Sequence, residues 1–532
     1  MPNYLSTPDI IIIVASLSLV VLVGLCVSGR RDETAGGYFL AGRKMPWWLI
    51  GPSFVATGIS SEQMVGTIGM TYQHGMGVAN WELFALPSYT VVMILFIPMY
   101  LANKVNTVPE YFGKRFGPLC ADIYSWVLLV AYVFVYLVTV LYSGSLVFSE
   151  MTGWSFSLVL ALTVVLTGLY TIKGGLTSVM WTDTIQCVLL VVGGAVLYFL
   201  LLSRIPGGWS ALTAAEPSRY HLYQPAGHEW APFLGMLFAS FGMFLFYQSG
   251  SQVMIQRMLG ARSTWDGIMG LIFAALINML RPFVTCFLGL IVWHWIFVMK
   301  QGHPLADKDQ AFAFALRELA PAWGVRGIVL AGFLAAVMST ISSLLNSTAT
   351  MFAYDVYKKF LDRNASERRM IRVGRWSACA ALAIAACLAP MVKQLGGIFQ
   401  FFQTAMTYIA CPFMATCLMG LLWKRTNYAG GIFGLLGGLV IQLLVAFGLP
   451  HLTGVKLHIF YNGAIAQLPI MIGIAVVSAL TPPNPEASNR YVWRKELLLQ
   501  YDEGAARPWW QRLSLWYVLY ALVWVSVYIV LW

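Results

Sequence analysis

The stretch ATGISSEQ at residues 56–63 interrupts a long apolar segment with small and polar side chains. A second stretch, YQSGSQ at residues 247–252, interrupts another apolar segment in the same way. Backbone groups released by a helix break are tolerated in hydrocarbon only where they line a cavity or bind an ion. The pair therefore predicts two broken helices around a central binding site. The alternative is that the small residues only allow close helix packing.

The composition is that of a polytopic membrane protein. Of the 532 residues, 59% are hydrophobic and 10% are charged, and the mean hydropathy is +0.72. A soluble core with a polar surface does not have this balance. A spanning helix needs roughly 20 apolar residues. The sequence predicts fourteen such spans: 10–28, 47–70, 79–101, 120–149, 155–171, 182–202, 232–255, 267–298, 328–352, 373–392, 396–422, 428–448, 459–480 and 514–531.

The two interruptions lie in the second and the seventh predicted spans. Because they are an odd number of spans apart, two five-span units that start with these spans must run in opposite directions. The sequence thus predicts an all-α integral membrane protein with an inverted 5+5 repeat. The expected units are 1–46 (first helix and cytoplasmic loop), 47–202 (first repeat), 203–231 (extracellular loop), 232–422 (second repeat) and 423–532 (three helices, with a cytoplasmic loop near 481–513).

Basic residues give the expected orientation. Alternate loops, counted from the one after the first span, hold 24 of the 33 lysines and arginines, and the other loops hold 8. Because such residues concentrate on the cytoplasmic side, we expect both termini outside and a multi-pass location in the plasma or bacterial inner membrane. The same bias explains the net charge of +11 without a nucleic-acid partner.

The sequence lacks the motifs of ATP-driven and hydrolytic chemistry. It contains no GxxxxGK[ST] loop, no HExxH pair and no GxSxG stretch, and its eight cysteines have no CxxC spacing. We therefore expect a secondary transporter rather than an enzyme, with no cofactor.

Only four of the 55 charged residues fall deep inside the apolar stretches, namely Glu62, Glu82, Asp183 and Arg281. An ionisable group at membrane depth is costly unless it faces a cavity or a partner, so each is a candidate functional residue. Asp183 has a structural alternative, as the N-cap of a helix that starts after the glycine pair at 174–175.

The ninth predicted span carries a strip of hydroxyl groups. Helical spacing puts Ser339, Ser342, Ser343 and Asn346 on one face, with Thr340 beside it. Together with carbonyl groups from the first break, these neutral oxygens suit a small hard cation such as sodium. The alternative is that the hydroxyls bond to carbonyls of their own helix.

Seven motifs together resemble the sodium/solute symporter family, and within it the sodium–sugar cotransporter branch. They are YFLAGR at 38–43 with WW at 47–48, SSEQ at 60–63, VPEY at 108–111, YTIKGGL at 170–176, WTDTIQ at 181–186, QR at 256–257 and LNSTAT at 345–350. The resemblance covers nearly the whole chain. It implies a LeuT-like core with one helix before it and three after, and sodium-coupled import of a sugar or polyol by alternating access. The implied partners are sodium, the solute and membrane lipids, and no oligomer is required.

The resemblance also implies ligands for sodium, which is the only metal expected. The main sodium site would use the carbonyls of Ala56, Ile59 and Ala336 and the hydroxyls of Ser339 and Thr340. A second sodium site would use Asp183, Ser339, Ser342 and Ser343. We therefore expect two sodium ions per solute.

For the solute, the resemblance implies Gln63, Glu82, Trp81, Tyr247, Gln248, Asn278, Arg281 and Gln403. Structural alternatives remain for three of them, because Glu82 can pair with a buried cation, Tyr247 can be a core residue and Gln403 can join helices.

The chain departs from the sugar carriers at several solute positions. Gly58, Ala85 and Phe244 stand where the carriers have polar residues, Asn278 replaces a lysine, and Arg281 appears one turn later. Arg281 either pairs with an acid such as Glu82 or holds an anionic solute. The second possibility supports an alternative function, the symport of a carboxylate-bearing or other small organic solute such as sialic acid. A sodium-permeable channel or a sensor on the same scaffold is a further alternative.

Overall fold

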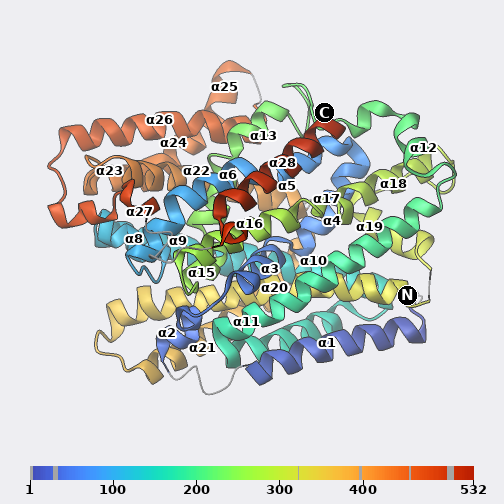
Figure 1. Cartoon of the computed structure of the whole chain (residues 1–532), viewed down its shortest axis with the longest axis horizontal. Helices are drawn as coiled ribbons and strands as arrows, with labels where there is room; N and C mark the ends of the chain where they lie inside the picture. The colour runs from blue at the N-terminus through green and yellow to red at the C-terminus, as the bar shows by residue number, and fades with distance from the viewer. Residues whose placement is uncertain (1–3, 28–33, 322, 395–397, 455–456, 500–507) are drawn as a thin grey trace.

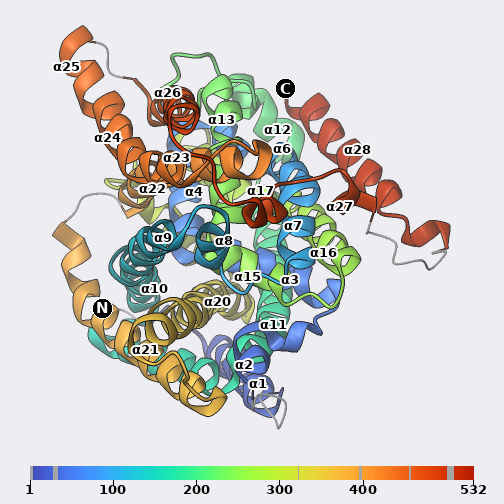
Figure 2. The ribbon, with the colours of Figure 1, turned by 90° about the vertical axis from the view of Figure 1, so that its left-hand side faces the viewer.

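The structure is a computed structural model that describes residues 4–27, 34–321, 323–394, 398–454, 457–499 and 508–532. The side chains of Glu62 and of residues 393–405 and 498–499 are not among those described. Within these ranges the chain is helical and contains no strand. Figure 1 shows the long helices running side by side, and Figure 2 looks along several of them.

Apolar segments of about membrane length form the longer helices of the bundle. These are α1 (Thr7–Val27), α3 (Trp47–Gly58), α4 (Ser61–His74), α9 (Pro118–Ala131), α10 (Leu137–Thr152), α11 (Phe156–Ser203), α16 (Thr264–Asn278), α18 (Cys286–Phe297), α20 (Val325–Met351), α21 (Glu367–Leu388), α22 (Ile398–Leu422), α26 (Ile459–Leu480) and α28 (Leu513–Leu531). Shorter helices complete or connect them. These are α2 (Ala35–Leu40), α5 (Asn80–Leu83), α6 (Ala85–Val91), α7 (Ile97–Ala102), α8 (Val108–Arg115), α12 (Gly208–Ala215), α13 (Phe233–Ala239), α14 (Met243–Leu245), α15 (Gln252–Leu259), α17 (Arg281–Val284), α19 (Ala311–Phe314), α23 (Tyr428–Ile432), α24 (Gly438–Leu443), α25 (Leu449–Thr453) and α27 (Glu496–Leu499).

The described residues include nine helices that are long and apolar enough to cross a membrane, or up to eleven if two bent pairs each form one span. The fourteen predicted stretches fall on helical segments wherever the chain is described. Breaks divide some of these stretches, so that α3 and α4 are each too short to count as a span. The all-helical membrane architecture is therefore confirmed, and the number of spans stays a prediction.

Helix α11 contains two of the predicted spans, 155–171 and 182–202, joined at a kink. Gly175 at this kink has φ 57° and ψ −159°, a conformation that L side chains rarely adopt. A Cβ atom on Gly175 would lie 2.4 Å from the carbonyl oxygen of Tyr38. Glycine is required here both by the backbone angle and by the close approach of α2.

Helix α20 lies at the centre of the bundle and α28 lies at its edge. In the most apolar window of each span, 94% of the residues are buried for Val325–Leu361 but only 11% for Leu513–Leu531. Figure 2 shows α20 surrounded by other helices and α28 on the outside. Polar groups on α20 are therefore shielded from lipid, so they can serve a binding site.

Both ends of the chain lie toward the same end of the helices, on the right in Figure 1. The Tyr4 amide donates to Met151 O at 3.3 Å, and the Leu222 amide donates to Leu531 O at 2.7 Å. The N-terminus thus meets the connection between α10 and α11, and the C-terminus meets the 203–231 loop. This agrees with the expectation that both termini share one side of the membrane.

Candidate functional site

The first predicted break is present. Helix α3 ends at Gly58, Ile59 (φ −114°, ψ 102°) and Ser60 (φ −105°, ψ 168°) are extended, and α4 begins at Ser61. Extended residues cannot continue the helical hydrogen-bond ladder, so carbonyl groups at the end of α3 are released from it. The small side chains of residues 57–60 leave room for this turn inside the bundle.

The second predicted break is also present. A π-helical turn over Phe246–Gly250 ends at Ser251 (φ −76°, ψ 122°), and α15 begins at Gln252. Side chains from α9 and the turn after it satisfy the released groups, because Tyr124 Oη donates to Gly250 O at 2.8 Å and Tyr132 Oη lies 2.9 Å from Ser251 Oγ.

Helix α20 meets the first break through its hydroxyl groups. Ser339 Oγ donates to Ala56 O at 2.8 Å and to Ala336 O at 3.0 Å, and Thr340 Oγ1 donates to Ala336 O at 3.0 Å. These four residues and Ile59 are all buried. The structure thus brings four of the predicted sodium ligands into direct contact, with Ile59 three residues beyond Ala56. Each hydroxyl can turn its proton away and offer a lone pair, so the donor set fits a small cation.

The residues predicted for the second sodium site also lie close together. Ser53 Oγ donates to Asp183 Oδ2 at 2.7 Å, and Thr57 Oγ1 lies 3.0 Å from Ser343 Oγ. Thr57 Oγ1 also approaches Asp183 Oδ2, at 3.5 Å, and so links Asp183 to Ser343. Ser342 Oγ donates to Ser339 O at 2.9 Å. The alternative role of Asp183 as an N-cap is wrong, because α11 continues through it and its carboxylate accepts from side chains of α3.

Arg257 on α15 is a site residue that the charge count missed. Its side chain is fully buried, its Nη2 lies 3.5 Å from Asp183 Oδ2, and it also donates to Ser343 Oγ. The statement that only four charged residues lie deep in the fold is therefore wrong. Arg257 was counted as a loop cation because it follows the predicted end of a span at residue 255. The available signal was its place six residues after the second break, on the helix that begins there.

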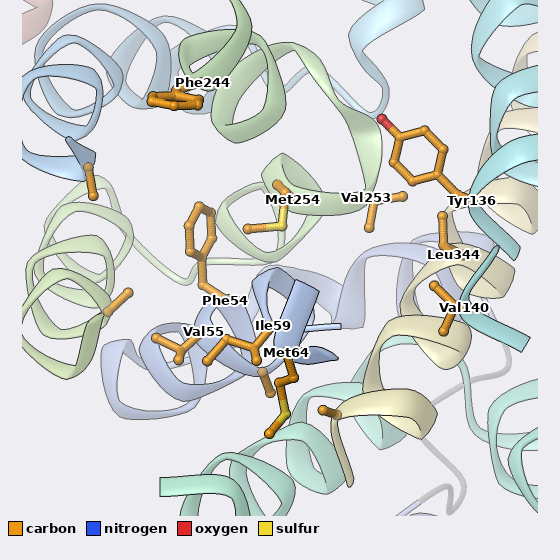
Figure 3. Packing of buried hydrophobic residues seen from close by; sticks show 14 of the residues in the cluster. Phe54, Val55, Ile59, Met64, Tyr136, Val140, Phe244, Val253, Met254 and Leu344 are labelled. Atoms are coloured by element: carbon orange, nitrogen blue, oxygen red, sulfur yellow. The ribbon is translucent and has the colours of Figure 1, made fainter. Parts of the chain in front are cut away.

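A cavity of about 790 Å³ lies beside the two breaks. Its described lining residues are Phe54, Val55, Gly58, Ser60, Gln63, Trp81, Glu82, Ala85, Tyr89, Met243, Phe244, Tyr247, Gln248, Met254, Asn278, Arg281 and Met406. Seven of the eight residues predicted to contact solute are in this set. The eighth, Gln403, lies on α22, and its side chain is outside those described. Figure 3 shows Phe54 and Phe244 on opposite sides of this space, with Met254 between their helices.

The polar groups of the cavity come from three helical segments. Arg281 Nη2 lies 3.5 Å from Glu82 Oε1, which joins α17 to α5. Asn278 Nδ2 donates to Tyr89 Oη at 2.6 Å. The predicted departures Gly58, Ala85 and Phe244 also face the cavity, so the loss of their polar groups changes its wall.

Aromatic rings cover the cavity on the side of the chain termini. Trp81 and Phe244 make an edge-to-face contact with centroids 4.5 Å apart, and Phe460 of α26 lies 5.8 Å from Trp81 and 6.4 Å from Phe244. The ring of His458 contacts Phe460 at 4.9 Å. Sequence reasoning missed Phe460, because nothing local marks one aromatic residue of a late helix as part of this cover.

Two broken helices, a hydroxyl-bearing central helix and a polar cavity at their meeting point define a secondary transporter with a LeuT-like fold. Residues 38–438 match the model of the sodium:solute symporter family. The chain belongs to the sodium:solute symporter family, which confirms the resemblance inferred from its motifs.

Named relatives and solved structures agree with this assignment. The sodium/glucose cotransporter of Vibrio parahaemolyticus is 31% identical over 471 residues, which cover 83% of this chain and 86% of that protein. Sodium/myo-inositol cotransporter 2 of Mus musculus is 30% identical over 547 residues, covering 93% and 80%. A Na⁺-coupled sialic acid symporter in a substrate-bound outward-open state matches with a TM-score of 0.78 and 22% identity, covering 90% of this chain and 99% of that chain. At this identity the structural match supports the fold alone.

Proposed function

We propose that this protein is a symporter that couples the inward movement of sodium to the uptake of an uncharged sugar or polyol. The observation that carries the proposal is the contact between Ser339 Oγ and Ala56 O at 2.8 Å, beside a cavity that Gly58 lines. The broken end of α3 therefore serves both proposed sites. The names of the sodium/glucose and sodium/myo-inositol relatives support the choice of solute.

The sharing of α3 explains how one ligand assists the other. Sodium bound by Ala56, Ile59, Ala336, Ser339 and Thr340 would hold α3 against α20, and this fixes the wall of the solute cavity. By linkage, solute binding then strengthens sodium binding by the same factor. Rocking of residues 47–202 against 232–422 would expose the cavity to each side in turn, with sodium leaving into the cytoplasm.

The number of sodium ions determines how far the solute can be concentrated. Each sodium ion that crosses a potential of 100 mV contributes about 2.3 kcal/mol. We propose two ions, the second held by Asp183, Ser339, Ser342 and Ser343. Arg257 already balances the charge of Asp183, so this second ion must compete with the guanidinium or displace it.

The proposed location is the plasma or bacterial inner membrane, with both termini outside. Three observations support this topology: the bias of basic residues toward one set of loops, the shared side of the two termini, and the buried hydroxyl groups of α20. The repeat boundaries at 47–202 and 232–422 belong to the same proposal, and no oligomer is required for it.

The test is uptake into proteoliposomes that contain the purified full-length protein. We expect accumulation of labelled glucose or myo-inositol with an inward sodium gradient, and loss of accumulation when choline replaces sodium. Equal uptake in choline would contradict sodium coupling. Sodium currents that flow without solute accumulation would instead support a channel.

A further inference from the structure

Among the described residues that line the cavity, Glu82 is the only acid and Arg281 is the only base. The side chain of Glu82 is fully buried and that of Arg281 is 10% exposed. Their charged atoms lie 3.5 Å apart, between Arg281 Nη2 and Glu82 Oε1. At this separation in a water-poor site the two charges largely cancel, so the cavity has no net charge.

Neighbouring groups hold the pair in place. Thr285 Oγ1 lies 3.1 Å from Glu82 Oε1 and 3.2 Å from Oε2, and it also donates to Arg281 O at 2.9 Å. The chain bends by 41° between α16 and Arg281–Phe297, with Pro282 directly after the arginine. Arg281 Nη2 also approaches Gly58 O at 3.5 Å. The guanidinium therefore lies between Glu82 and the broken end of α3, where an added Cβ on Gly58 would meet only Met254.

Three buried polar atoms on residues of the cavity wall have no hydrogen-bond partner within the described part of the chain. They are Arg281 Nε, which is a donor, and the amide oxygens Asn278 Oδ1 and Gln248 Oε1, which are acceptors. A buried polar atom without a partner is costly, so such atoms mark positions where a ligand can supply the missing bond. A hydroxyl group can donate to an amide oxygen and accept from a guanidinium N–H. The three atoms thus complement a polyhydroxylated molecule.

We propose that Glu82 and Arg281 form a charge-balanced selectivity pair that admits uncharged polyols and rejects both anionic and cationic sugars. The proposal rests on the proposed sugar or polyol transport and adds its charge rule. A solute carboxylate that binds Arg281 must displace Glu82 and leave that acid buried without a cation. A solute ammonium that binds Glu82 leaves Arg281 unpaired in the same way. Uncompensated buried charge is the costly outcome in both cases.

The first experiment uses the wild-type protein alone, in sodium-dependent uptake of labelled glucose or myo-inositol. Unlabelled glucose, glucuronate and glucosamine at pH 6 compete as neutral, anionic and cationic forms of nearly the same molecule. We expect glucuronate and glucosamine to bind at least about tenfold more weakly than glucose. Competition by glucuronate or sialic acid as strong as that by glucose overturns the pair proposal. Absence of any sodium-dependent polyol uptake would instead count against the proposed function.

Three variants then test the origin of the selectivity. Glu82→Gln leaves Arg281 uncompensated, so we expect glucuronate to gain relative to glucose by about tenfold or more. Arg281→Gln leaves Glu82 uncompensated and should favour glucosamine instead. The double variant removes both charges and should again discriminate against both charged sugars.

The matched control is Glu150→Gln, which removes an acid outside the cavity lining and should leave the preferences unchanged. Thermal unfolding of each variant in detergent, with and without sodium, shows that it is folded. Unchanged preferences in folded Glu82→Gln and Arg281→Gln overturn the proposal, whereas opposite changes in the two single variants support it.

Discussion

The hydroxyl of Ser339 is the part of the proposed sodium site whose removal gives the sharpest test. Its Oγ lies 2.8 Å from Ala56 O and 3.0 Å from Ala336 O, and the side chain is fully buried. Ser339→Ala deletes one of five proposed ligands and adds no new group. It also removes the hydrogen bond that joins α20 to the broken end of α3.

The expected loss follows from the charge of the ion. A polar contact to a charged group contributes about 1.5–3 kcal/mol. Since each tenfold change in affinity corresponds to about 1.4 kcal/mol, sodium affinity should fall by about 10- to 150-fold. Because sodium and solute binding are linked, the apparent solute affinity should fall at low sodium and recover at saturating sodium.

The assay is the initial rate of solute uptake into proteoliposomes as a function of sodium concentration. Sodium-dependent thermal stabilisation of the purified protein provides a readout that does not require transport. Ser88→Ala is the matched control, because Ser88 is also buried and its Oγ bonds to Phe84 O and Ala85 O of its own segment. If folded Ser339→Ala protein keeps its half-saturating sodium concentration within about twofold of wild type, the proposed site is in the wrong place.

Three further predictions concern stability and pH. Asp183→Asn should destabilise the protein by about 3–5 kcal/mol, because it leaves Arg257 buried and unpaired; thermal denaturation should show most of the loss recovered when Arg257→Met is added, and no recovery would contradict the pairing. Gly175→Ala should cost about 1–3 kcal/mol, because its positive φ and the approach of a carbonyl exclude a side chain, whereas Gly36→Ala, with open space around it, should have little effect on the melting temperature. Burial, with a smaller opposing contribution from the Glu229 backbone and a further lowering by His228, lowers the pKa of His458 from 6.5 to about 4. The neutral form is thus favoured in the folded state, so its contribution to stability is full above pH 6.5 and is lost as the pH falls toward 4. His458→Asn, which can still cap α26 but does not titrate, should reduce that loss in melting curves recorded from pH 7 to pH 4, and an unchanged pH profile would show that His458 is not responsible.

Much of the architecture follows from local sequence. The interruptions at 56–63 and 247–252 predicted both breaks, because a glycine-containing polar stretch at membrane depth cannot remain an ordinary lipid-facing helix. The hydroxyl spacing on 335–348 likewise identified the helix that faces the first break. These features are readable because each depends on neighbours along one helix.

Pairings between distant residues required the tertiary structure. The sequence left open whether Arg281 pairs with Glu82 or holds an anion, and the fold shows the pair at 3.5 Å. It also placed Arg257 in a loop, whereas packing buries this residue against Asp183.

What the sequence by itself determined is thus the membrane class, the two breaks and the residue types of the proposed sites. What only the tertiary structure decided is which charges cancel and which rings cover the cavity. The physical reason is that helix breaking and hydropathy depend on local backbone satisfaction and residue composition. Charge compensation, in contrast, depends on burial and on atomic distances that only the packed helices set.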